Sequence, residues 1–60
     1  MEKIYGYIKY ENHNGGINNL QVLILKDENF RTLKTFTSIC KKSIQYGKTW
    51  SKKNNYNYVV

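Results

Sequence analysis

The sequence predicts a small α+β fold, in which an antiparallel sheet of three to four strands packs against one short helix in the order β-β-β-α-β. Three patterns predict it: period-two alternation in residues 3–10, a nearly continuous apolar run in residues 20–26, and helical spacing of apolar side chains in residues 39–47. The chain has 60 residues, which suits a single small domain covering residues 1–60. An all-β, barrel-like arrangement is the alternative.

Residues 3–10 form the first predicted strand, because β-branched and aromatic residues alternate there with period two. One face carries Ile4, Gly6, Ile8 and Tyr10. The outer face carries Lys3, Tyr5, Tyr7 and Lys9. Glycine weakens a strand, so Gly6 is expected to mark a bulge or a close contact with another element.

Two turns separate the next strands. Asparagines and glycines in residues 12–16 favour a turn because both residue types tolerate positive φ, and the polar residues 26–29 favour a second turn. Residues 20–26 are apolar on both faces, which is typical of a central strand. Residues 30–36 are expected to pair with that strand as a hairpin.

The second half of the chain is expected to hold the helix and a last strand. Thr37 or Ser38 is the predicted N-cap, and Gly47 is the predicted end of the helix. The predicted buried stripe consists of Ile39, Cys40, Ser43, Ile44 and Gly47. A strand at residues 39–46 is the alternative. Residues 47–55 are expected to form a basic loop around Trp50, and residues 56–60 a paired terminal strand.

Charge is distributed unevenly along the chain. The formal net charge is +6, but residues 1–30 hold three lysines and four acidic residues, whereas residues 31–60 hold seven basic residues and no acidic one. The codons of an AT-rich gene favour lysine, so the lysine total alone is weak evidence. Such coding does not account for the absence of acids from half of the chain, which indicates a surface for an anionic partner.

The leading interpretation is a non-catalytic nucleic-acid-binding module, for DNA or RNA, with regulation as one role. Tyrosines flanked by lysines on a strand resemble a stacking platform beside a phosphate track. The expected binding residues are Lys3, Tyr5, Tyr7, Lys9, Arg31, Lys34, Lys41, Lys42, Lys48, Trp50, Lys52 and Lys53. The alternatives are that Tyr5 and Tyr7 pack under the helix or in a dimer interface, and that Trp50 anchors the core.

Catalysis, metals and cofactors are not expected. His13 is the only histidine and is predicted to lie in a turn, away from any partner for acid–base chemistry. Cys40 is the only cysteine and is expected to be buried. Asp27 and Glu28 are expected to form a polar turn rather than a carboxylate pair in a cleft.

The second interpretation is a protein of a phage or mobile element that inhibits a host protein, such as a defence factor. It would bind an acidic patch or add an edge strand to its target. Exposed edge strands also make a homodimer possible. No apolar run reaches the roughly 18–20 residues of a membrane span, and residues 1–9 lack the core of a signal peptide, so a bacterial or phage-infected cytoplasm is the expected location.

Overall fold

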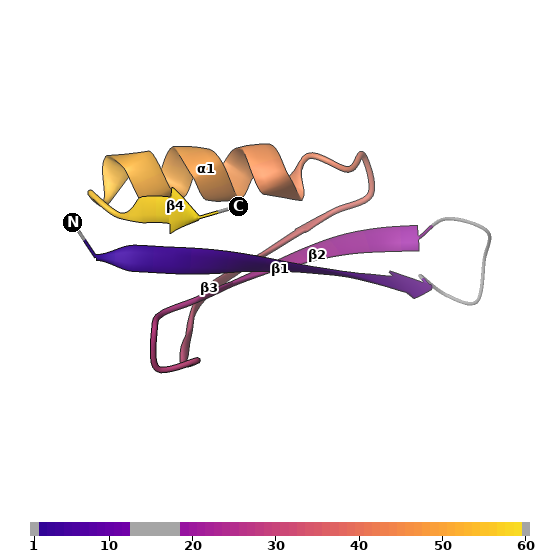
Figure 1. Ribbon diagram of the computed structural model, residues 1–60. Helices are drawn as coiled ribbons and strands as arrows, with labels where there is room; N and C mark the ends of the chain where they lie inside the picture. The colour runs from indigo at the N-terminus through magenta and orange to yellow at the C-terminus, as the bar shows by residue number, and fades with distance from the viewer. Residues whose placement is uncertain (1, 13–18, 60) are drawn as a thin grey trace.

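The computed structural model describes residues 2–12 and 19–59 as a sheet covered on one face by a helix (Figure 1). Along the chain the elements are β1 (Lys3–Asn12), β2 (Asn19–Lys26), β3 (Thr32–Ser38), α1 (Ser43–Lys53) and β4 (Asn57–Val59). The predicted α+β class and the predicted order of elements are confirmed. The turn expected at residues 12–16, which includes His13, lies outside the described residues except for Asn12 at the end of β1.

The four strands lie in the order β3-β2-β1-β4, so β2 and β1 are central. β2 pairs antiparallel with both β1 and β3, as the predicted hairpins require, whereas β4 pairs parallel with β1. The sheet is therefore mixed rather than purely antiparallel, and it is not closed into a barrel. The cause is α1, which carries the chain back across the sheet from β3, so that β4 runs in the same direction as β3 and β1.

The core lies between the sheet and α1. Leu23 of β2 stands opposite Ile8 of β1 and Phe36 of β3, and directly opposite side chains share a face of the sheet. Ile4, Leu23 and Leu25 are fully buried on this face. Each such side chain contributes about 1.5–3 kcal/mol by leaving water. Five partly buried side chains pack around the three: Leu33, Phe36, Trp50, Tyr56 and Tyr58.

Helix α1 begins later than the sequence predicts. Ser38 does not cap it, because the Ser38 Oγ accepts hydrogen bonds from the N–H groups of Cys40 and Lys42 at 3.1 and 3.2 Å and ends β3 in a turn. Ile39 and Cys40 are exposed, as is Ile44, so the prediction that these three belong to a buried stripe was wrong. Within the described residues, no helix is long and apolar enough to cross a membrane.

Helix α1 also ends later than the sequence predicts, because it continues through Gly47 to Lys53. The predictions of a loop at residues 47–55 and, alternatively, of a strand at residues 39–46 were therefore wrong. Ser43, Gly47 and Ser51 form its buried stripe. A Cβ atom on Gly47 would overlap the side chain of Leu23, so this glycine lets the helix approach β2 closely and does not end it.

The predicted polar turn between β2 and β3 is confirmed, and Asp27 organises it. One carboxylate oxygen of Asp27 accepts hydrogen bonds from the N–H groups of Asn29 and Arg31, each at 2.9 Å. These bonds, led by the one from the Arg31 N–H, hold the pKa of the buried Asp27 carboxyl below its ordinary value. Phe30 has a φ of 63° in this turn, so β3 begins at Thr32 and not at Phe30.

Candidate functional site

The expected binding residues of β1 lie on the sheet face that points away from α1. Ile4 is buried under the helix, and side chains alternate along a strand, so the opposite face carries the sheet-face set of Lys3, Tyr5, Tyr7 and Lys9. Phe30 packs edge-on against Tyr7, with ring centroids 5.5 Å apart, and the Nζ of Lys26 lies 3.8 Å from the Phe30 centroid. Tyr5 and Tyr7 therefore do not pack under α1.

The remaining expected lysines lie on the other side of the sheet. Lys48, Lys52 and Lys53 belong to α1, and Lys41 and Lys42 directly precede it. Lys34 of β3 stands opposite the buried Leu25 and so faces the helix side. These are the helix-side lysines: Lys34, Lys41, Lys42, Lys48, Lys52 and Lys53. The sheet separates them from the sheet-face set, so the expected residues do not form one continuous surface.

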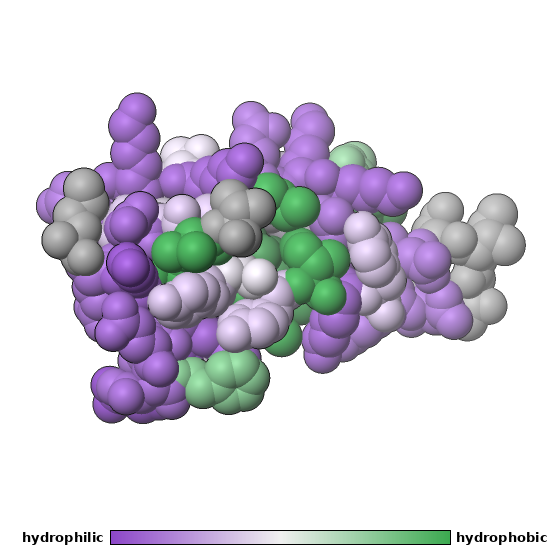
Figure 2. Space-filling view, viewed as in Figure 1, coloured by the Kyte–Doolittle hydropathy of each residue, from purple (hydrophilic) through white to green (hydrophobic). Residues whose placement is uncertain are grey.

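Ion pairs neutralise two of the expected basic residues. The Nζ of Lys9 lies 2.8 Å from the Glu11 carboxylate, and the Nε of Arg31 lies 3.1 Å from the Asp27 carboxylate. Among the described residues, the helix-side lysines form no ion pair, and the sequence has no acidic residue after Glu28. Lysines without an ion pair are therefore most numerous around α1, where mostly hydrophilic residues line the top of the view in Figure 2.

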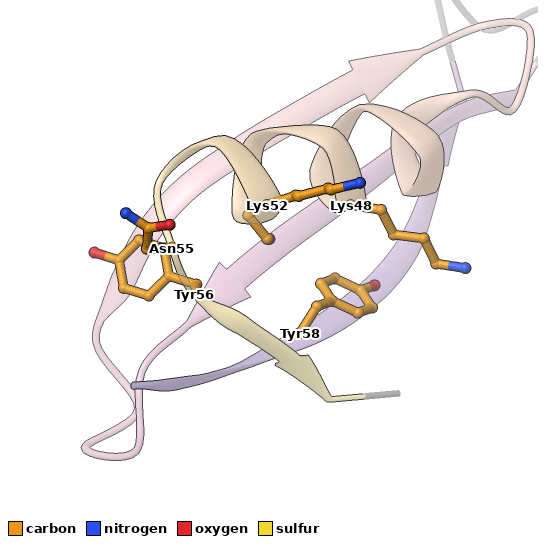
Figure 3. Close-up of a pocket in the computed structure, with 6 residues that line it drawn as sticks. Lys48, Lys52, Asn55, Tyr56 and Tyr58 are labelled. Atoms are coloured by element: carbon orange, nitrogen blue, oxygen red, sulfur yellow. The ribbon is translucent and has the colours of Figure 1, made fainter. Parts of the chain in front are cut away.

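A groove of about 360 Å³ opens between the second half of α1 and β4. It is lined by Lys48, Ser51, Lys52, Asn55, Tyr56 and Tyr58. Lys48 and Lys52 are four residues apart and so lie on the same side of the helix. In Figure 3 their side chains run along one side of the groove, Tyr58 stands below them, and Asn55 and Tyr56 stand at the other end.

The end of α1 places the two tyrosines in this groove. Asn55 adopts a left-handed φ of 61°, and its N–H donates to the Lys52 carbonyl at 3.2 Å. The N–H of Tyr56 donates to the Ser51 carbonyl at 2.8 Å. This pair of bonds is the Schellman motif, with Asn55 in the position usually held by glycine. It reverses the chain, so that β4 returns beside the helix that it follows.

Trp50 and Tyr56 are held together by this helix end. Their rings stack with centroids 5.4 Å apart and planes 16° apart, which is the apolar contact that often accompanies a Schellman motif. Trp50 also lies 6.4 Å from Phe36, edge to face, and packs against the core. The alternative in which Trp50 anchors the core therefore describes its position, and Trp50 does not line the groove.

Tyr58 lies across β1 at Gly6. A Cβ atom on Gly6 would overlap the Tyr58 hydroxyl, so the glycine provides the close contact that its position in a strand suggests. Partial burial raises the pKa of the Tyr58 phenol above its ordinary value of 10.0. A phenol is protonated at neutral pH with or without this shift, so the hydroxyl can donate a hydrogen bond. Tyr58 thus brings a neutral donor to the groove below the two lysines.

Four groove residues were not among the expected site residues: Ser51, Asn55, Tyr56 and Tyr58. The sequence carries a signal for them, because paired asparagines after two lysines are typical of a helix end with a left-handed residue. Gly47 competes with that signal, because a glycine is the stronger local indication of a helix end. Because Gly47 was the predicted helix end, residues 47–55 were expected to form a loop. A groove between a helix and the last strand was therefore not predicted.

Comparison with known proteins leaves the geometry as the basis for functional inference. No protein-family model matches this chain, and no curated protein or solved structure is significantly similar to it.

Proposed function

We propose that this protein is a non-catalytic nucleic-acid-binding module that uses the layer around α1. The observation that carries the proposal is the position of Lys48 and Lys52, which form no ion pair among the described residues and flank a groove lined by two tyrosines. Ammonium groups attract phosphates, and aromatic rings accept stacked bases. Both kinds of group meet at this one place.

The contribution of each expected residue follows from its position. Lys34, Lys41, Lys42 and Lys53 extend the positive layer and would add phosphate contacts beyond the groove. Arg31 is bonded to Asp27, and the sheet-face set points away from α1, so these residues are left out of the proposed contact. Trp50 supports the site by holding Tyr56 in place.

The test is the dependence of binding on salt, measured by fluorescence anisotropy with labelled DNA and RNA. Each phosphate contact is expected to add about 0.7–0.9 to the slope of log affinity against log salt concentration. Lys52→Gln should lower that slope, whereas Lys3→Gln on the other sheet face should leave it unchanged. Binding that does not respond to salt, or no binding to any DNA or RNA at low ionic strength, would contradict the proposal.

A second candidate function is protein binding at the edge of β1. β4 pairs only with Lys3–Tyr5, and in the part of the chain that the structure describes no strand covers the same edge of β1 beyond Tyr5. Ile8 and Tyr10 are exposed there, and hydrophobic residues gather along the middle of this side in Figure 2. An extended segment of a host protein, or of a second copy of this chain, would fit as an added strand.

This second function predicts a protein partner that stays bound after nuclease treatment. Ile8→Lys places a charge where the added strand would pack and should abolish binding, whereas Thr35→Lys on the exposed part of β3 should not. Pull-down from a nuclease-treated lysate of a low-GC bacterium measures the loss, and sedimentation at micromolar concentration identifies a homodimer. Equal capture by both variants would rule out this edge as the binding surface.

A further inference from the structure

We infer that the groove between α1 and β4 holds one unpaired nucleotide, with its phosphate between Lys48 and Lys52 and its base against Tyr56. This inference rests on the proposed nucleic-acid binding and specifies its substrate as a single strand. It is carried by the arrangement in Figure 3, in which Lys48, Lys52 and Tyr58 stand toward one end of the groove, here called the cationic end, and Asn55 and Tyr56 stand at the other, here called the aromatic end.

The size of the groove suits one nucleotide. Its volume of about 360 Å³ is at the lower end of the roughly 300–1,000 Å³ found for small-molecule sites. A duplex is far too wide to enter it, and the bases of a duplex are stacked inside the helix. A base can reach Tyr56 only when it is unpaired, so the groove discriminates in favour of single strands.

The cationic end matches a phosphate. Lys48 and Lys52 reach the groove from consecutive turns of α1, and among the described residues no carboxylate pairs with either. Below them stands Tyr58, whose phenol is neutral at neutral pH. Two ammonium groups and one neutral hydroxyl provide the charge and the hydrogen-bond donors that a phosphodiester oxygen accepts.

The aromatic end matches a base. Trp50 covers one face of the Tyr56 ring, and Tyr56 also lines the groove, where the base would contact the side of the ring that Trp50 does not cover. The stack holds this ring before any ligand arrives, so little side-chain entropy is lost on binding. Asn55 lines the same end, and its carboxamide offers both a donor and an acceptor to the edge of a base.

Trp50 is the only tryptophan of the chain and stacks on Tyr56, so its fluorescence reports on the groove. The protein is titrated with four probes: inorganic phosphate, adenosine monophosphate, a single-stranded oligonucleotide of roughly 12 nucleotides, and the matching duplex. The single strand should bind about tenfold or more tightly than the duplex at low salt. Adenosine monophosphate should change the fluorescence at lower concentration than phosphate does, since phosphate lacks the base.

Variants distinguish binding in the groove from general attraction by positive surface charge. The double variant Lys48→Gln/Lys52→Gln should lower the salt slope for the single strand by about 1.4 and abolish the response to adenosine monophosphate. The matched control Lys3→Gln/Lys9→Gln removes the same formal charge from the opposite face of the sheet and should leave both the slope and that response unchanged. Tyr56→Leu should weaken single-strand binding roughly tenfold, and Tyr56→Phe, which keeps the stacked ring, should bind as the native protein does.

The outcomes distinguish this inference from the proposed function. Equal affinity for single strand and duplex would overturn the inference and leave general nucleic-acid binding in place. Equal losses of single-strand affinity in the two double variants would do the same. No binding of any nucleic acid at low ionic strength would overturn both. The lysine variants do not touch the core, so they decide the question even if Tyr56→Leu fails to fold.

Discussion

The carboxamide oxygen of Gln21 accepts two hydrogen bonds from Ser43, one from its hydroxyl at 2.6 Å and one from its backbone N–H at 3.3 Å. Both side chains are buried, and they join the middle of the sheet to the first turn of α1. The first N–H groups of a helix have no partner within it, and α1 has no side-chain cap of its own at Lys42. Gln21 therefore does for this helix start what a local N-cap residue does elsewhere.

We expect Ser43→Ala to lower the free energy of unfolding by about 1 kcal/mol, because it removes one of the two bonds. Gln21→Leu should cost about 1–3 kcal/mol, since it leaves the buried hydroxyl and N–H of Ser43 without their acceptor. The double variant should cost less than the sum of the single ones, because both remove the same bond. Urea denaturation measures all three, and strictly additive losses would show that the two side chains are not coupled.

Gly47 is expected to resist replacement although it lies in the middle of a helix. Alanine is usually better than glycine there by about 1 kcal/mol, but its Cβ would overlap the Cδ2 methyl of Leu23, a fully buried side chain in a close-packed core. Overpacking of a core costs about 1–3 kcal/mol, so Gly47→Ala should destabilise the protein, and Gly47→Val should do so more strongly. Thermal unfolding tests this, with the exposed Lys53→Ala as the control that stays within about 0.5 kcal/mol.

Asp27 is expected to make stability depend on pH in the acidic range. The pKa of its carboxyl is lowered in the folded state, so the folded protein binds a proton less readily than the unfolded chain. The stabilisation is complete above the ordinary pKa of 3.8 and is lost as the pH falls through the lower folded-state pKa. Asp27→Asn has no such titration, so its stability should be lower at neutral pH and should fall less on acidification.

Denaturation at a series of pH values from neutral to strongly acidic compares the two proteins. Glu28→Gln is the matched control, because Glu28 is the exposed neighbour of Asp27 in the same turn. Parallel stability profiles for native protein and Asp27→Asn would show that the turn does not depend on the Asp27 charge.

Cys40 is expected to react with a thiol reagent in the folded protein. It is exposed in the turn between β3 and α1, and its N–H is bonded to the Ser38 hydroxyl. Labelling should proceed at a similar rate with and without denaturant, because no unfolding is needed to reach the thiol. Cys40→Ser should leave the melting temperature unchanged, whereas a buried cysteine would show protection until the protein unfolds.

Local patterns were sufficient to predict the strands and the presence of one helix, but not where that helix begins and ends. The alternation around Ile4 and Tyr5 reports which side chains share a face, because that depends on the strand geometry alone. The extent of α1 depends on contacts that no local window contains: Gln21 supports its start, and Leu23 makes Gly47 a packing residue. The glycine therefore predicted a helix end where the helix continues.

The sequence by itself determined the fold class, the order of elements and the absence of acids beyond Glu28, since composition and periodicity are properties of the chain. Only the tertiary structure decided where the charges stand. The crossover through α1 put β4 beside β1 and placed Lys48 with Tyr58 at one groove. The sheet also separated Lys48 and the other helix-side lysines from Tyr7, because side chains on opposite faces of a sheet cannot meet. The sequence pattern alone does not show on which side of the sheet the helix lies.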